Sequence, residues 1–258
     1  MKINDLKKIL GVIDLTNLDY NCEVDDIINL KKKALNPYKF VASCCVWPKF
    51  LSLLKKDLEF EGIKLCTVLN FPNGELKFKD IKSEIEMTIN EGVDEIDFVI
   101  PYNSVLKNDF KPLEEIILSF KNCDIINKNN IYLKAIIETG ELRSEKLISK
   151  TSSFLAKNNI NFIKTSTGKV KINATPKSAE IILKIIKSLK KENIVGLKVS
   201  GGIKTINQAM IYMDLYKKIL GQKCISKRFF RIGTSSLFDI VVNEIKILEE
   251  NNRNPDDN

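Results

Sequence analysis

The sequence predicts an α/β protein built as a single (β/α)8 barrel of the TIM type. Short runs rich in apolar and β-branched residues recur along the 258 residues, and amphipathic segments separate them. Successive runs begin roughly 25 to 37 residues apart, the length of one strand–loop–helix–loop unit. Eight such units fill the chain, whose length is typical of one barrel.

Eight strands are expected, one at the start of each unit. Their apolar runs place them near residues 9–16, 40–47, 64–71, 95–102, 132–139, 162–168, 196–202 and 229–236. No segment between them has the composition of an interdomain linker.

The segments between the strands carry helical signals. Thr175 and Pro176 supply an N-cap and a first-turn proline. The apolar residues that follow lie on one helical face: Ala179, Ile182, Leu183, Ile186 and Leu189. Residues 81–89 and 142–155 show the same period, and a short helical segment is expected at the N-terminus.

The two ends of the chain are expected to differ. Residues 1–248 form the barrel domain, and residues 249–258 form a flexible polar tail because they carry no apolar stripe. The N-terminus has no signal-peptide apolar segment, and no apolar run approaches the ~18–20 residues that span a bilayer. A cytoplasmic protein without a membrane partner is therefore expected.

The composition argues against several kinds of catalytic and metal-binding site. The six cysteines are scattered without C-x-x-C pairs, which favours reduced buried thiols over disulfides or a metal site: Cys22, Cys44, Cys45, Cys66, Cys123 and Cys224. The chain has no histidine, so Ser-His-Asp and Cys-His nucleophiles and histidine-ligated metals are excluded. Catalysis must use Lys, Asp, Glu, Cys, Ser, Thr or Tyr.

The net charge of +8 permits binding of nucleic acid or attraction of phosphorylated substrates. No dense basic tract interleaved with aromatic residues is present, so a solvated basic surface is the favoured interpretation. No nucleic-acid partner is expected.

Lys164 is the strongest candidate for chemistry. In Phe-Ile-Lys-Thr-Ser-Thr-Gly-Lys of residues 162–169, strand alternation places Phe162, Lys164 and Ser166 on one side. A lysine that points into a tight barrel interior is disfavoured as an ammonium, which lowers its pKa and favours the neutral amine that attacks carbonyls. The alternative is a lysine that points outward between helices.

Other charged residues recur near the ends of the strands, where barrel enzymes keep their active sites. Lys198 occupies the corresponding point of the next strand and would repel Lys164, and Lys134 lies on the strand before. Asp97 and Asp14 are carboxylates inside apolar strands. Each alone is best explained as a solvated charge, but together they fit proton transfer around an imine.

Two glycine-containing segments predict a phosphate site. Residues 200–204 follow the seventh strand and residues 233–236 the eighth, where many barrels bind phosphate through backbone N–H groups. Ordinary loop glycines and serine caps are the alternative. No P-loop or dinucleotide motif occurs.

At this point the chain resembles the class I deoxyribose-phosphate aldolases, whose signature is similar to residues 162–169. Supporting matches run in order through nearly the whole chain: residues 11–18, 70–74, 91–97, 136–142, 173–176, 201–202 and 231–236. The resemblance implies cleavage of 2-deoxyribose 5-phosphate to glyceraldehyde 3-phosphate and acetaldehyde, without metal or other cofactor. It also implies a homo-oligomer, either a dimer or a tetramer.

Residue roles follow from the resemblance. It implies that Lys164 forms the Schiff base, while Lys198 and Asp97 assist proton transfer. The phosphate would face Gly168, Lys169, Gly201, Gly202, Ser235 and Ser236. Further substrate contacts are expected from residues at the strand ends: Asp14, Thr16, Cys45, Lys134, Thr165 and Gly233.

The chain also departs from the family pattern. Val199 and Ser200 stand where the family often has Pro and Ala, and the last tyrosine is Tyr216, so the tail has no tyrosine to fold over the site. Two other functions stay open. One is a different lysine Schiff-base lyase or a transaldolase, and the other is a non-catalytic barrel that binds phosphate or RNA.

Overall fold

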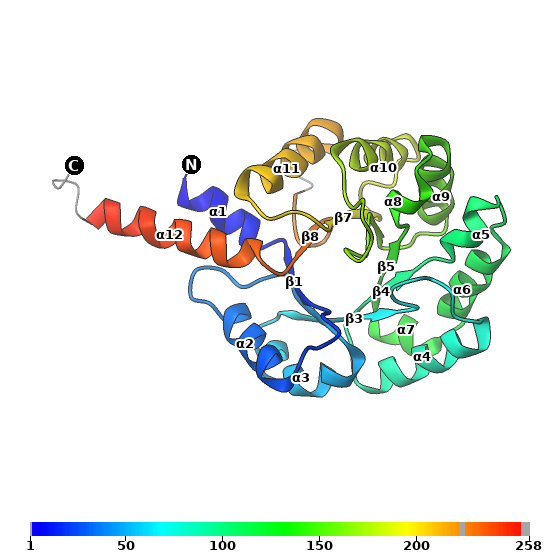
Figure 1. Cartoon of the computed structure of the whole chain (residues 1–258), viewed down its shortest axis with the longest axis horizontal. Helices are drawn as coiled ribbons and strands as arrows, with labels where there is room; N and C mark the ends of the chain where they lie inside the picture. Colours follow the sequence, from blue (N-terminus) through cyan, green and yellow to red (C-terminus); the bar gives the residue numbers. More distant parts are fainter. Residues whose placement is uncertain (1, 222–224, 254–258) are drawn as a thin grey trace.

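Eight parallel strands close into a barrel, with helices outside it (Figure 1). The computed structural model describes residues 2–221 and 225–253, without the side chains of residues 78, 82 and 253. The strands follow sequence order around the barrel, and the last pairs with the first. The predicted (β/α)8 architecture is confirmed.

All eight predicted strands are present. Their bounds are β1 Ile13–Asn17, β2 Ser43–Val46, β3 Lys64–Leu69, β4 Glu95–Val99, β5 Tyr132–Ile136, β6 Phe162–Lys164, β7 Gly196–Ser200 and β8 Phe230–Thr234. Most end earlier than predicted, because the polar residues after each strand leave the ladder and enter the loops that form the site.

The helices on the outside include short turns within the longer connections. Their bounds are α1 Ile3–Leu10, α2 Val24–Ala34, η1 Pro48–Phe50, α3 Leu51–Phe60, α4 Phe78–Asn90, α5 Tyr102–Leu106, α6 Lys111–Lys121, α7 Asp124–Asn129, α8 Thr139–Leu142, α9 Glu145–Lys157, α10 Pro176–Ser188, α11 Ile206–Leu220 and α12 Leu237–Arg253.

Two predicted boundaries were wrong. The first strand begins at Ile13, because Ile9 and Leu10 bury the apolar face of α1 together with Leu6. The helix predicted over residues 142–155 is interrupted after α8 and restarts as α9. The Ser144 hydroxyl caps α9 by accepting a hydrogen bond from the backbone N–H of Leu147 at 3.4 Å.

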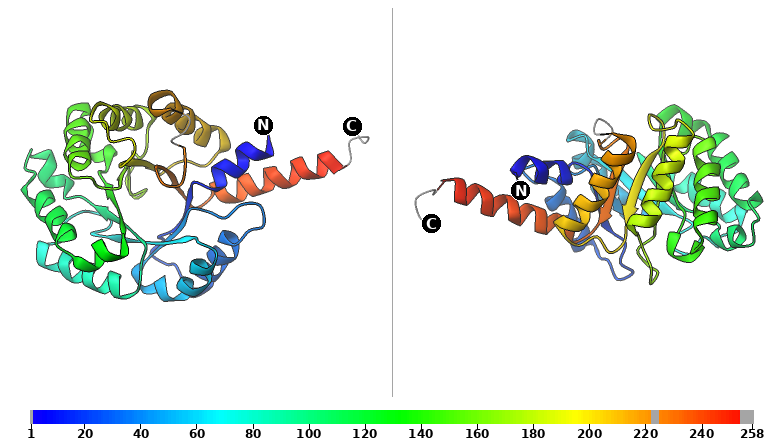
Figure 2. Two further views of the ribbon diagram at one scale, coloured as in Figure 1. Left: turned by 180° about the vertical axis from the view of Figure 1, so that it is seen from behind. Right: turned by 90° about the horizontal axis from the view of Figure 1, so that it is seen from above.

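Other helical predictions were confirmed. Thr175 caps α10 and shares a capping box with Ser178. The N-terminal helix α1 lies beside α12, which extends away from the barrel (Figures 1 and 2). This last helix continues to Arg253, so residues 249–253 of the expected tail are helical. Their Glu and Asn side chains need no buried partner in a solvent-exposed helix. Residues 254–258 lie outside the described part of the chain.

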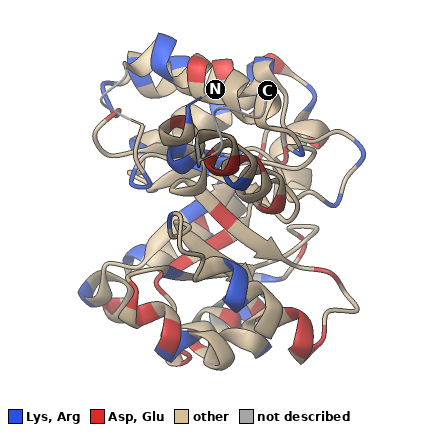
Figure 3. Cartoon of the chain, turned by 90° about the vertical axis from the view of Figure 1, so that its left-hand side faces the viewer, with Lys and Arg blue, Asp and Glu red and all other residues tan. Residues whose placement is uncertain are grey.

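Charged residues of both signs are spread over the outer helices, and some also lie on the strands at the centre (Figure 3). In the described part of the chain, no helix combines the length and apolarity needed to cross a membrane. The described cysteines are free thiols, and four of the five are buried, as predicted. Cys224 lies outside the described residues.

Candidate active site

The interior of the barrel holds charged side chains in place of a purely apolar filling. Seven buried residues form what we call the ion-pair network: Asp14, Glu95, Asp97, Lys134, Lys164, Lys198 and Arg231. A buried charge without a partner is very costly, so each of these groups needs the others. The network contains four cations and three carboxylates.

Asp97 lies at the centre of the network. Its Oδ2 atom is 2.8 Å from Nζ of Lys164 and 2.6 Å from Nζ of Lys198, and its Oδ1 atom is 2.9 Å from Nζ of Lys134. The register explains this convergence, because Lys164 pairs with Lys198 and Asp97 pairs with Lys134 on adjacent strands. Three amines from neighbouring strands therefore reach one carboxylate.

Arg231 binds two carboxylates of the network. Its guanidinium donates two hydrogen bonds to Glu95, at 2.6 and 3.1 Å, and a third to Asp14. Gly233, two residues further along β8, leaves room for Lys198, because a Cβ there would lie 3.1 Å from Cε of that lysine. Besides Asp97, Lys198 also contacts Asp14, whose Oδ2 atom lies 2.6 Å from Nζ of Lys198.

Electrostatics fixes the protonation of the central groups. Burial works to raise the pKa of Asp97, but Lys134, Lys164 and Lys198 outweigh it and hold that pKa well below its usual range. Burial works to lower the pKa of Lys198, but Asp14 and Asp97 outweigh it and raise that pKa. Lys198 is therefore a cation held by two carboxylates, and Asp97 is ionised.

A cavity of about 190 Å³ opens at the carboxyl ends of the strands, above the network. Lys164 is the one member of the network that lines it. The walls come from the ends of β1, β7 and β8, with Thr16, Ser200 and Thr234, and from the loops that follow these strands and β6, with Thr167 in the last of them. An amine at the floor of a small polar cavity is the arrangement that a Schiff-base enzyme requires.

Glycine backbone forms part of the cavity wall. Gly168, Gly201 and Gly202 have φ values of 85°, 85° and 78°, where a side chain would be strained. A Cβ at Gly201 would also lie 2.4 Å from the Asn173 side chain. Ser235 and Ser236 complete this wall directly before α12, whose N-terminus favours an anion. The arrangement suits a phosphate group.

Glu138 was missed by the sequence analysis. It follows β5 with a left-handed φ of 47°, is fully buried, and accepts a 2.5 Å hydrogen bond from the hydroxyl of Thr167. Burial raises the pKa of Glu138. Its position at a strand end, like those of the predicted residues, was the signal that could have found it.

Most residues predicted for the site come together. Those that line the cavity are Thr16, Lys164, Gly168, Lys169, Gly201, Gly202, Gly233, Ser235 and Ser236. Asp14, Asp97, Lys134 and Lys198 lie beneath it in the network. Glu95 and Arg231 were not predicted, although alternation places Glu95 on the same side of β4 as Asp97.

Four predicted substrate contacts do not line the cavity: Asp14 and Lys134, which belong to the network, and Thr165 and Cys45. The hydroxyl of Thr165 accepts a 3.1 Å hydrogen bond from the backbone N–H of Ser200, so this side chain ties the end of β6 to the end of β7. Cys45 is fully buried and packs with Leu18, Cys66 and Val68.

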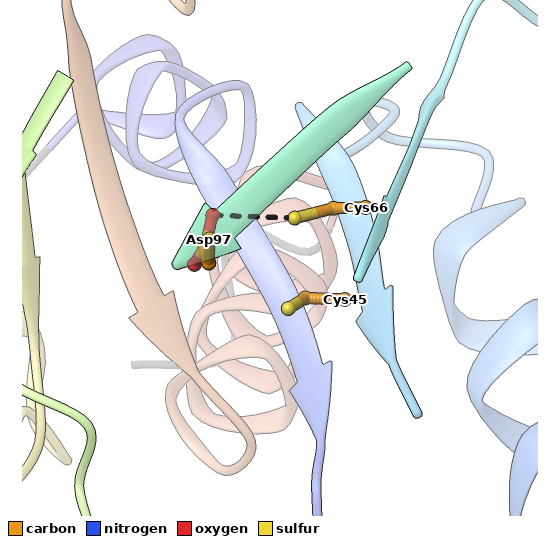
Figure 4. Close-up of side chains that lie close together, drawn as sticks. All are labelled: Cys45, Cys66 and Asp97. Atoms are coloured by element: carbon orange, nitrogen blue, oxygen red, sulfur yellow. Dashed lines mark hydrogen bonds between the residues drawn. The ribbon is translucent and has the colours of Figure 1, made fainter. Parts of the chain in front are cut away.

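Cys45, Cys66 and Asp97 are the described residues that come closest to a metal site. One potential ligand atom from each lies within 4.8 Å of the others (Figure 4). The same carboxylate already binds the amines of Lys134, Lys164 and Lys198, and these would repel a metal cation. The electrostatics therefore disfavours a metal here.

Comparison with known proteins finds aldolases similar to this chain in sequence and in fold. A deoxyribose-phosphate aldolase of Agrobacterium fabrum (strain C58) is 36% identical over 235 residues, which cover 91% of this chain and 89% of that protein. A solved structure of a candidate deoxyribose-phosphate aldolase from Toxoplasma gondii ME49 has a TM-score of 0.83 at 19% identity, over 96% of this chain and 95% of the other.

A third match is the deoxyribose phosphate aldolase of Aeropyrum pernix, with a TM-score of 0.72 at 22% identity. It covers 96% of this chain and 93% of the other, and it is described as a tetramer. At these identities the solved structures establish the fold. The curated relative and the family model, which matches residues 5–238, establish the family. The chain belongs to the DeoC/LacD family of aldolases.

Proposed function

We propose that this chain is a class I aldolase that reversibly cleaves 2-deoxy-D-ribose 5-phosphate into D-glyceraldehyde 3-phosphate and acetaldehyde, through a Schiff base on Lys164. One observation carries the proposal. Lys164 is the only amine of the ion-pair network that also lines the cavity, with the phosphate-suited glycine loops on the same wall. The activity named for the Agrobacterium relative fits this arrangement.

The charge balance of the network supports Lys164 as the nucleophile. Lys134, Lys198 and Arg231 each contact at least two carboxylates, whereas Lys164 contacts Asp97 alone. With four cations against three carboxylates, loss of a proton from Lys164 leaves the network neutral. The free amine can then attack the substrate aldehyde.

The bond changes follow from imine chemistry. Nζ of Lys164 adds to C1 of the substrate, and loss of water gives a protonated imine. The electrons of the C2–C3 bond then move toward the imine nitrogen as the C3 hydroxyl loses its proton, which releases glyceraldehyde 3-phosphate and leaves an enamine. Protonation at C2 and hydrolysis release acetaldehyde and restore Lys164.

Asp97 and Lys198 are the proposed proton carriers. Asp97 Oδ2 lies between the two amines, at 2.8 Å from Lys164 and 2.6 Å from Lys198, so protons can pass within one hydrogen-bonded group. Lys134 and Asp14 hold this group in place from below through their contacts with Asp97 and Lys198.

The proposed phosphate contacts are the backbone of Gly168, Gly201 and Gly202, the serines 235 and 236, and the ammonium of Lys169. Ser200, which replaces the Ala common in the family, lines the same wall and donates a hydrogen bond to the backbone carbonyl of Ser166. This hydrogen bond connects the end of β7 to the loop after β6, and both segments lead into proposed phosphate contacts.

We also propose a homo-oligomer, a dimer or tetramer, that works in the cytoplasm. The tetramer described for the Aeropyrum relative supports the first part, and the five free thiols of the described residues support the second. Light scattering on the purified chain would give its mass in solution directly, and a monomer would refute the oligomer.

Borohydride trapping tests the central proposal. Protein incubated with acetaldehyde and reduced with borohydride should carry one ethyl group on the peptide that contains Lys164. The Lys164→Arg variant should carry none there, while the surface variant Lys184→Arg should label as wild type does. Absence of any adduct would refute the Schiff-base mechanism, and an adduct on Lys198 or Lys134 would reverse the assigned roles.

Substrate identity needs a separate measurement. The wild-type protein should release glyceraldehyde 3-phosphate from 2-deoxyribose 5-phosphate. If trapping succeeds but this substrate is not cleaved, the chain is another lysine Schiff-base lyase or a transaldolase.

A further inference from the structure

Two thiols face each other beneath the floor of the cavity. Cys45 on β2 and Cys66 on β3 are register partners in adjacent parallel strands, and both are fully buried. Figure 4 shows their sulfur atoms close to each other and to the carboxylate of Asp97, with the hydrogen bond from Cys66 to Asp97 dashed. The catalytic proposal gives neither thiol a chemical role.

Backbone geometry allows these two residues to bond. Neighbouring strands lie about 4.8 Å apart, and a disulfide joins Cα atoms that are about 4.4–6.8 Å apart. The sulfur atoms already lie within 4.8 Å of each other. Bond formation therefore needs rotation of the side chains and little movement of the strands.

The surroundings distinguish the two thiols. The neighbouring Cys66 side chain lowers the pKa of Cys45, and Lys198 and Lys164 act in the same direction; together they outweigh burial and the charge of Asp97, which work to raise it. Burial raises the pKa of Cys66, so it stays a thiol. Cys45 is thus the nucleophile of the pair, and Cys66 supplies the second sulfur.

We propose that Cys45 and Cys66 form an oxidation-sensitive pair that a hydroperoxide converts to a disulfide. The Cys45 thiolate attacks one peroxide oxygen and becomes a sulfenic acid, and the other oxygen leaves as hydroxide or alkoxide and takes up a proton. The Cys66 thiol then displaces water from the sulfenic acid. With hydrogen peroxide, two thiols and one peroxide give one disulfide and two waters.

The active-site cavity gives the oxidant a route to the pair. Leu18 lines the cavity and also packs in the small apolar cluster that contains Cys45 and Cys66. Leu18 therefore connects the lining of the cavity to the cluster that contains the thiols. Hydrogen peroxide is small enough to pass during ordinary side-chain motion.

The disulfide would change the environment of Asp97. The Cys66 thiol now donates to Oδ1 of Asp97 at 3.3 Å and accepts from Nζ of Lys134 at 3.2 Å. Oxidation removes the thiol hydrogen and moves the sulfur toward Cys45, so both contacts are lost. The expected loss of aldolase activity rests on the proposed function, whereas the disulfide itself does not.

Peptide mapping tests the pair. The reduced full-length protein is exposed to hydrogen peroxide, its remaining thiols are alkylated under denaturing conditions, and the products are digested with trypsin. We expect peptide 40–49 linked to peptide 65–77 with the loss of two hydrogens. Cys44 shares the first peptide, but it lies in the outer apolar core, where burial raises the pKa of its thiol.

Variants identify the linked residues. The link should persist in Cys44→Ala and vanish in Cys45→Ala and Cys66→Ala. A link through Cys44 would overturn the proposal, as would irreversible oxidation of Cys45 while Cys66 remains open to alkylation. These outcomes need no aldolase activity, so they are independent of the test of the Schiff base.

Activity shows the consequence for the site. Peroxide should lower wild-type aldolase activity about tenfold or more, since general acid–base catalysis is worth roughly 10²–10⁴-fold. Dithiothreitol should restore it. Cys45→Ala, which lacks the thiol that peroxide attacks, should keep its activity through the same exposure when compared with its own untreated sample. Equal loss in both proteins would overturn the link between the pair and Asp97.

Discussion

A single carboxylate organises the chemistry at the scale of residues. Asp97 binds three amines, yet only Lys164 among them reaches the cavity. The types of these residues could be read from the sequence, since lysines and aspartates inside apolar strands are rare. Their pairing could not, because it depends on side-chain lengths and on which carboxylate each amine reaches. The sequence analysis expected Lys198 to repel Lys164, but it did not predict that Asp14 and Asp97 both form ion pairs with Lys198.

Replacing Asp97 with asparagine should damage both activity and stability. The amide cannot balance the amines that it faces, and breaking a buried ion pair on one side costs about 3–5 kcal/mol. The proton carrier is also lost, so kcat should fall by roughly 10²–10⁴-fold. Enzyme assays and urea unfolding would measure the two effects.

The matched control is Asp57→Asn. This carboxylate forms an ion pair with Lys31 on the surface, at 2.6 Å, and should be replaceable without a measurable change in either quantity. Wild-type activity in Asp97→Asn would remove Asp97 from the proton relay.

At the scale of elements, the strands set which side chains meet. All eight strands were predictable, because each is an apolar, β-branched run of the right length. The start of β1 could not be predicted, since Ile9 and Leu10 are as apolar as the strand. Only their packing assigns them to α1. The break between α8 and α9 was missed because Leu142 was taken as the first apolar residue of the helix, whereas it is the last residue of α8. The cavity walls depend on loop conformations, which hydrophobic periodicity does not encode.

Gly201→Ala tests the loop after β7. The substitution meets a left-handed φ of 85° and places Cβ 2.4 Å from the side chain of Asn173. Relieving that overlap must move the β7 loop or the Asn173 segment, and both neighbour the proposed phosphate contacts. We expect KM for the phosphorylated substrate to rise by about tenfold or more, equivalent to the loss of roughly 1.4 kcal/mol of binding.

Gly62→Ala is its control, because Gly62 has a φ of 66° but nothing within 4 Å of an added Cβ. It should lose the stability that the strained φ costs, about 1–2 kcal/mol, and keep its KM. A normal KM in Gly201→Ala, measured with the same substrate series, would mean that this loop does not position the phosphate.

At the scale of the whole molecule, the buried network ties stability to pH. The pKa values of Asp14, Glu95 and Asp97 are all lowered: burial opposes ionisation of each carboxylate, but the buried cations outweigh it. Groups with depressed pKa values stabilise the folded state above their unfolded pKa, and this contribution is lost as pH falls toward the folded pKa. The chain has no histidine, so no unperturbed side chain titrates between pH 5 and 8.

The free energy of unfolding should therefore fall steeply below about pH 4, near the unfolded pKa values of Asp and Glu. With three carboxylates protonating on unfolding, the slope can approach 4 kcal/mol per pH unit. Urea unfolding at pH 5, 4 and 3 would measure it. Because the network is buried, the fall should survive a rise in salt that screens surface pairs. In Asp97→Asn the pH dependence should be shallower, since one of the three protons is no longer taken up. An equal slope in wild type and variant would mean that the surface carboxylates, and not the network at the centre of the barrel, control the stability of this fold in acid.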